Sequence, residues 1–68
     1  MNCEFIFTFP ISDERRNNKF VRVIAPDEIA ARLRMIDAYG RRGWAFCYEN
    51  ENEAGVAKYG LTEIAFGS

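Results

Sequence analysis

The chain has 68 residues and a mass of 7.8 kDa, with 49% hydrophobic and 28% charged residues, which is typical of one small globular domain spanning 1–68. Nine basic residues against ten acidic ones leave a net charge of −1, which excludes the simple class of strongly basic nucleic-acid binders. The absence of histidine from the sequence excludes histidine-based catalysis and most zinc-site patterns.

The two cysteines, Cys3 and Cys47, are too few for the disulfide framework of a small secreted domain. The apolar N-terminal run is interrupted by Glu4 and lacks a preceding basic residue, so it does not resemble a signal peptide. No apolar stretch approaches the ~20 residues that span a bilayer. We therefore expect a cytoplasmic protein with no membrane partner, no metal and no cofactor.

Two alternating segments predict the first two strands. Residues 3–9 place three phenylalanines on one face, and residues 19–25 place Val21 and Val23 on one face and Phe20 and Ile24 on the other. Pro10 ends the first strand, and residues 11–18 form a polar, charged connection. The two strands are therefore expected to pair as a hairpin across a long loop.

The clearest element is a helix over residues 26–40. Pro26 is tolerated in a first helical turn, and Asp27 and Glu28 place negative charge at the positive end of the helix dipole. Ile29, Leu33 and Ile36 follow at i, i+4 and i+7, and this stripe predicts the face that packs on the sheet.

The remaining chain predicts two more strands. Residues 44–49 alternate, residues 50–55 form a polar turn, and residues 56–66 make a last strand that bends near Gly60. The predicted fold is α+β, with a four-stranded, mainly antiparallel sheet, one packed helix and the order β-β-α-β-β. Trp44, Phe46 and Leu33 are expected in the core.

Both predicted sheet faces carry apolar side chains, whereas one helix covers only one face. The uncovered face would hold Phe7 or Phe20, depending on where the helix packs, and would be closed by a second copy or a partner. The alternative is that the 11–18 loop or the C-terminal residues cover that face. A second candidate surface is the helix stripe of Ala31, Met35 and Ala38, although alanine also suits any exposed helix face.

Charged residues give the other candidate contacts. Glu49, Glu51 and Glu53 form either a solvated hairpin tip or a negative surface that attracts a basic partner. Arg34 belongs to a set of arginines on the helix and the loops, which together with the strand aromatics would suit a nucleic-acid surface. Acidic residues interleave the arginines and the aromatic RNA-binding motifs are missing, so we do not expect nucleic acid as the partner.

The segment from Ile36 to Phe46, Ile-Asp-Ala-Tyr-Gly-Arg-Arg-Gly-Trp-Ala-Phe, resembles a signature of a group of small bacterial domains of unknown function, in which a helix ends in a glycine turn and Gly-Trp enters a strand. With the preceding strand, the resemblance extends over residues 19–66. In size and type the chain is also similar to small phage-encoded inhibitors such as anti-CRISPR proteins. These resemblances imply no catalytic residues.

No arrangement of side chains in the sequence suggests an active site, since neither serine has a histidine partner and no glycine-rich phosphate loop occurs. We therefore expect a small non-enzymatic protein-binding module, an inhibitor or adaptor that occupies a surface of a larger bacterial or phage complex. Its partner would be another protein, or a second copy in a homodimer. The alternatives are a nucleic-acid-associated module that uses the arginines and a structural homodimer.

Overall fold

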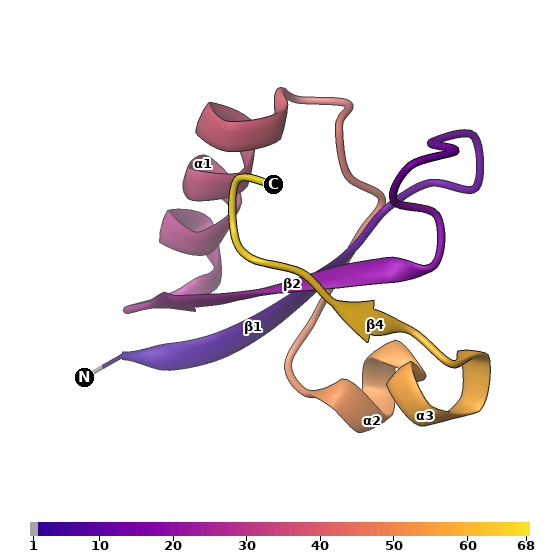
Figure 1. The fold of residues 1–68 in the computed structure, drawn as a ribbon. Coiled ribbons are helices and arrows are strands. Elements are labelled where there is room, and N and C mark those ends of the chain that lie inside the picture. Colours follow the sequence, from indigo (N-terminus) through magenta and orange to yellow (C-terminus); the bar gives the residue numbers. More distant parts are fainter. Residues whose placement is uncertain (1) are drawn as a thin grey trace.

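The two alternating segments form the central strands of the sheet, β1 (Cys3–Thr8) and β2 (Lys19–Ala25). They pair antiparallel, in a register that runs from Cys3 opposite Ala25 to Thr8 opposite Phe20, which confirms the predicted pairing. The computed structural model describes residues 2–68, and Figure 1 shows helices on both sides of this central pair.

Two short strands complete the sheet. β3 (Phe46–Tyr48) pairs antiparallel with β1, and β4 (Thr62–Glu63) pairs parallel with β2, giving the order β3-β1-β2-β4. The α+β class is thus confirmed, but the sheet is mixed rather than mainly antiparallel. The reason is that the chain crosses below the sheet from one edge to the other and enters β4 in the direction of β2 (Figure 1).

The second half of the chain differs most from expectation. Residues 50–59 form two helical turns, α2 (Glu51–Ala54) and α3 (Val56–Tyr59), where a polar turn and a long strand were predicted. The side chain of Asn50 caps α2 by accepting a bond from the backbone N–H of Glu53. Gly55 and Gly60 end the two turns with φ values of 74° and 64°, a region that favours glycine. The element order is therefore β-β-α-β-α-α-β, not β-β-α-β-β.

The long helix α1 (Glu28–Tyr39) lies inside the predicted range. Asp27 is its N-cap, and the Asp27 carboxylate accepts a hydrogen bond of 2.8 Å from the backbone N–H of Ala30. At the other end, the N–H of Gly40 donates to the carbonyl of Ile36. The helix thus starts after Pro26, which was predicted in its first turn, and Asp27 acts as the cap rather than only as a charge near the helix dipole.

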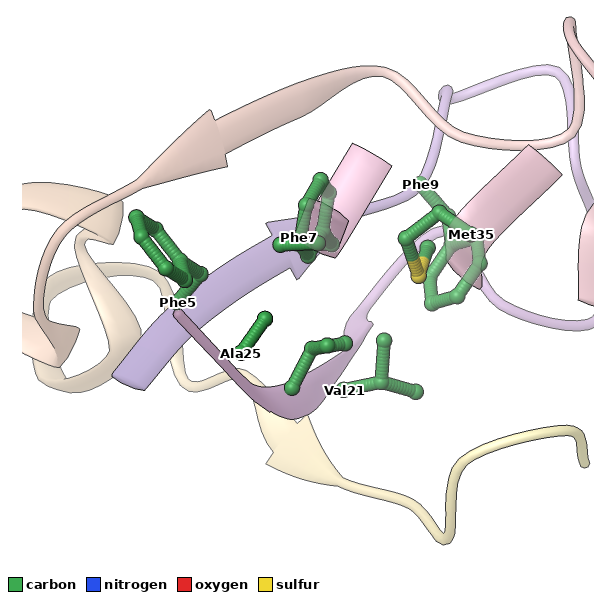
Figure 2. Packing of buried hydrophobic residues seen from close by; sticks show 8 residues of the cluster. Phe5, Phe7, Phe9, Val21, Ala25 and Met35 are labelled. Carbon is green, nitrogen blue, oxygen red and sulfur yellow. The ribbon is translucent and has the colours of Figure 1, made fainter. Parts of the chain in front are cut away.

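The main core lies between α1 and one face of β1 and β2 (Figure 2). The sheet contributes the large side chains, and the helix contributes only Ala31 and Met35 as fully buried residues. The buried sheet residues are Phe5, Phe7, Phe9, Val21, Val23 and Ala25. This alternation of the strand residues agrees with the sequence pattern.

The helix face that packs on the sheet is the opposite of the predicted one. Ile29 and Leu33 are exposed, whereas Ala31 and Met35 are fully buried. The three phenylalanines of the first strand segment already fill the space between the layers, so the helix approaches the sheet through small or adaptable side chains. The prediction that Leu33 is a core residue is therefore wrong.

The second face of the sheet is covered by α2 and α3, which lie opposite α1 in Figure 1. Ile6, Phe20 and Ala54 are buried there, and Tyr48, Val56 and Leu61 pack around them. Phe7 on one face and Phe20 on the other are thus both inside the protein. The expected uncovered sheet face is absent from the described residues 2–68, because the chain segment assigned to a strand folds back as helical turns.

The Gly43–Trp44 junction places an indole against the main core. Trp44 is half-buried, and its ring meets the ring of Phe7 edge-to-face at a centroid distance of 5.0 Å. A Cβ at Gly43 would collide with the carbonyl oxygen of Tyr39, so the close turn requires glycine. Phe46, two residues later, has 63% of its surface exposed, so its predicted place in the core is wrong.

Substitutions at Trp44 should separate packing from hydrogen bonding. The indole Nε1 is buried, and no hydrogen-bond partner for it occurs within residues 2–68. Trp44→Ala removes the ring and should lower the free energy of unfolding by about 3 kcal/mol. Trp44→Phe keeps an aromatic ring and removes the unpaired N–H, so the loss should stay below about 1 kcal/mol. Urea unfolding measures both, and equal losses would contradict this placement of the ring.

Candidate functional site

The outward face of α1 carries an apolar stripe, which we call the α1 stripe and define as Ile29, Leu33 and Ile36. Ile29 is 73% exposed and Leu33 is 60% exposed, while Ile36 is half-buried. The spacing of i, i+4 and i+7 sets the three side chains on one side of the helix, opposite the buried Ala31 and Met35. Neighbouring exposed apolar side chains on a rigid helix are a feature of interaction surfaces.

Arginines flank the α1 stripe on both sides. On the β3 side, Arg32 bonds Glu28 at 2.7 Å and its guanidinium lies 5.2 Å from the centre of the Trp44 ring. On the opposite side, Arg34 lies beside β2 and the C-terminal residues, and no ion pair to it occurs within residues 2–68. The surface therefore combines aliphatic side chains with one compensated and one uncompensated positive charge.

The structure separates the residues that the sequence analysis grouped as interface candidates. Phe7, Phe20, Ala31 and Met35 are buried in the two cores and do not reach the surface. Ala38 and Arg34 are exposed on α1, and Glu49, Glu51 and Glu53 are exposed at the start of the second helical region. The residues that form the exposed stripe were visible in the sequence but were assigned to the core, because both helix faces carry apolar residues.

Glu51 has a structural role that the sequence did not indicate. The Arg22 guanidinium bridges three carboxylates, with Nη1 at 2.8 Å from Glu4 and Nη2 at 2.8 Å from Glu51 and 3.0 Å from Glu63. Hydrogen bonds that the Arg22 guanidinium donates to Glu63, then to Glu51 and Glu4, raise the pKa of Arg22 above its already high value. This cluster joins β1, β2, α2 and β4 and leaves an excess of negative charge around it.

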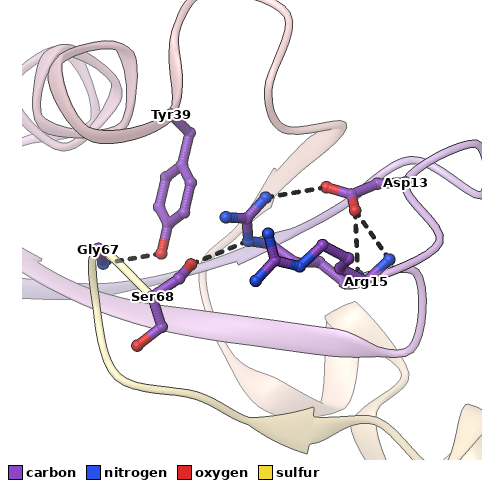
Figure 3. A network of polar contacts seen from close by, with 6 residues as sticks. Asp13, Arg15, Tyr39, Gly67 and Ser68 are labelled. Carbon is purple, nitrogen blue, oxygen red and sulfur yellow. Dashed lines mark hydrogen bonds and ion pairs between the residues drawn. The ribbon is translucent and has the colours of Figure 1, made fainter.

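The C-terminal residues are tied to α1 and to the first loop (Figure 3). The backbone N–H of Gly67 donates to the Tyr39 hydroxyl at 2.7 Å, and the Arg16 Nε donates to the Ser68 carbonyl at 2.9 Å. Burial opposes ionisation of Asp13, but hydrogen bonds from the Arg16 side chain and from the loop backbone outweigh it and lower the pKa of Asp13. These hydrogen bonds thus hold the C-terminal residues 64–68 against the end of α1 and the first loop.

The two cysteines differ in environment. Cys3 is exposed, while Cys47 is half-buried on β3. Burial raises the pKa of the Cys47 thiol, the negative charges of Glu28 and Glu49 raise it further, and Arg32 partly opposes them. Cys47 is therefore held as a neutral thiol at neutral pH.

No helix within residues 2–68 is long and apolar enough to cross a bilayer. The same part of the chain contains no group of three or more cysteine or acidic side chains placed to hold a metal ion. Comparison with known proteins adds no relative, since no family model, curated protein or solved structure matches the chain. The candidate site is thus defined by its geometry, and the α1 stripe is its clearest feature.

Replacing Arg22 should expose the repulsion among its carboxylate partners. Arg22→Met should lower the free energy of unfolding by about 1 kcal/mol, a value reduced by the partial solvent exposure of the cluster. Raising NaCl from about 0.05 to about 0.5 M should reduce the difference in unfolding free energy between Arg22→Met and wild type, because salt screens the repulsion among the remaining carboxylates. The control is Arg15→Met, which removes a loop arginine with no ion pair within residues 2–68. Equal losses in the two variants would contradict a special role for Arg22.

The two thiols should react at different rates with a disulfide reagent at neutral pH. Cys3, measured in a Cys47→Ser variant, should react several times faster than Cys47, measured in a Cys3→Ser variant, because burial and a raised pKa both reduce the reactive thiolate of Cys47. Absorbance of the released thiol measures the rates. Faster reaction of Cys47 than of Cys3 would contradict the burial of the Cys47 thiol on β3.

Proposed function

We propose that this chain is a small, non-enzymatic protein-binding module of the cytoplasm, which docks through the α1 stripe. The observation that supports this proposal is the exposure of Ile29 and Leu33 on successive turns of a helix whose other face is anchored in the core. A helix of this kind presents its apolar side chains at fixed positions, which is the requirement for insertion into a groove of a partner.

Burial of the α1 stripe would supply part of the binding energy. Complete burial of one exposed aliphatic side chain contributes about 1.5–3 kcal/mol, and Ile29 and Leu33 are already largely fixed by the helix. Little of the helix backbone has to be ordered on binding, which lowers one entropic cost, while further contacts around the α1 stripe have to offset the lost translational and rotational freedom. Arg32 and Arg34 would then contact the rim of the groove.

The charges favour a different protein over a second copy as the partner at this surface. If two copies packed stripe to stripe in antiparallel orientation, the flank with Arg32 would meet the same flank of the other copy. In parallel orientation, Arg32 would meet Arg34 of the other copy. The antiparallel arrangement also brings the two Arg34 flanks together, and because Arg34 has no ion pair within residues 2–68, whereas Glu28 offsets Arg32, the Arg34 charges disfavour an antiparallel homodimer through α1.

A module of this kind would act as an inhibitor or adaptor by covering a surface of a larger bacterial or phage complex. This action needs no catalytic group. Protein binding is favoured over nucleic-acid binding because Arg16, Arg22 and Arg32 are engaged in intrachain ion pairs, which reduces the charge available for phosphate contacts.

The proposal is tested by quantitative capture from a lysate of the source cells with immobilised protein. The Ile29→Ser/Leu33→Ser double variant should keep the melting temperature within a few degrees of wild type, because both side chains are exposed, and should lose the proteins that wild type retains. Phe46→Ser is the matched control, since it removes an equally exposed apolar side chain from β3. If the double variant retains the same proteins as wild type, the α1 stripe is not the docking surface.

A further inference from the structure

Half of one edge of β2 has no neighbouring strand. β4 pairs only with Lys19 and Phe20, whereas β1 pairs with β2 along its whole length to Ala25. After β4 the chain turns away from the sheet towards the end of α1, as Figure 1 shows, and the contacts of Gly67 and Ser68 hold it there. Within the described residues 2–68, residues 22–25 of β2 therefore have a strand on one side only.

The hydrogen-bond pattern shows which backbone groups face this open edge. The carbonyls of Asn18 and Phe20 accept bonds from Thr62 and Ile64 on the β4 side. Because N–H and C=O groups alternate between the two sides of a strand, Arg22 and Ile24 direct theirs to the same side, beyond the point where β4 ends. Each of these two residues thus offers one donor and one acceptor to an added strand.

A cavity of about 260 Å³ follows this edge and is lined by Arg22, Val23, Ile24, Arg34 and Phe66. Ile24 and Phe66 are each 46% exposed, so apolar surface lies on both sides of the open backbone groups. Arg34 reaches this cavity from α1, with no ion pair within residues 2–68. The cavity therefore combines strand-pairing groups, apolar contacts and one uncompensated positive charge.

We infer that an extended segment of a partner protein adds to the sheet beside residues 22–25 of β2, with a carboxylate side chain directed at Arg34. Side chains alternate along an added strand, so this carboxylate lies on the α1 face. The next side chain lies on the opposite face, near the carboxylates of Glu4 and Glu63 around Arg22, where a basic side chain is favoured. The preferred segment is thus extended and alternates acidic with basic residues.

A second copy of the chain fits this edge poorly. Two β2 edges paired across a twofold axis would bring Arg34 of both copies to the same face of the joint sheet, which opposes association. The open edge is also separate from the α1 stripe, so failure of one proposal leaves the other standing.

Hydrogen exchange of the free protein tests the premise. The amides of Arg22 and Ile24 should exchange at least about tenfold faster than those of Val21 and Val23, which pair with β1. Comparable protection at all four positions would show that the edge is already covered and would overturn the inference.

A peptide titration of the protein, followed by NMR, tests which kind of segment binds beside residues 22–25 of β2. The probe is a capped seven-residue peptide of β-branched residues with glutamate and lysine at alternating positions, and its control carries glutamine in place of glutamate. At low salt the glutamate peptide should shift the amides of residues 22–25 and bind about two- to fivefold more tightly than the control, the range of one exposed ion pair. Equal binding, no binding, or shifts confined to α1 would overturn the inference, and so would shifts at residues 22–25 on raising protein concentration alone.

A matched pair of variants tests the mode of binding. Ile24→Pro removes the N–H that faces the open edge, whereas Ile24→Thr keeps that N–H and the β-branched shape and replaces the ethyl arm of the side chain by a hydroxyl. Both should stay folded because the Ile24 N–H has no partner on that edge and the side chain is partly exposed. The proline variant should bind the glutamate peptide about fivefold more weakly than the threonine variant, the effect of one hydrogen bond. Equal affinity of the two variants would overturn strand addition.

The Arg34→Gln variant tests the charge contact. It should abolish the preference for the glutamate peptide over the glutamine peptide, and persistence of that preference would overturn the role of Arg34.

Discussion

The fold depends on a volume constraint in the main core. Phe5 and Phe7 project from one face of β1, and with Phe9, just after the strand, they fill most of the space between the sheet and α1. Because protein interiors are close-packed, the helix can approach only through its small face, with Ala31 at the centre and the flexible Met35 beside it. The volume of these phenylalanine side chains therefore decides which face of α1 packs against the sheet.

This constraint also determines the chemistry of the surface. When Ala31 and Met35 face the sheet, the helical repeat turns Ile29 and Leu33 towards solvent. The same rotation sets Arg32 over the Trp44 ring and Arg34 beside the open half of β2. The helix surface and the strand edge are thus linked by one rigid element, and a change in the core packing would move both.

The second half of the chain closes the other face of the sheet with few residues. α2 and α3 cover Ile6 and Phe20, and Arg22 connects their side of the sheet through Glu4, Glu51 and Glu63. β4 then pairs with only two residues of β2 before the chain leaves to meet Tyr39. The residues that follow β4 brace α1 instead of extending the strand, which leaves this part of the β2 edge open within residues 2–68.

The sequence by itself determined the α+β class, the pairing of the first two strands and the approximate place of α1, because these follow from local patterns: alternation in the strands and the apolar periodicity of the helix. Residues 50–55 were predicted as a polar turn and residues 56–66 as a strand, whereas the Asn50 cap and the left-handed Gly55 and Gly60 produce two helical turns between 51 and 59. Only the tertiary structure decided which of two apolar helix faces is buried and which half of β2 is unpaired. Both choices depend on how side-chain volumes fit between layers and on where the chain leaves the sheet, and a periodic pattern contains neither quantity.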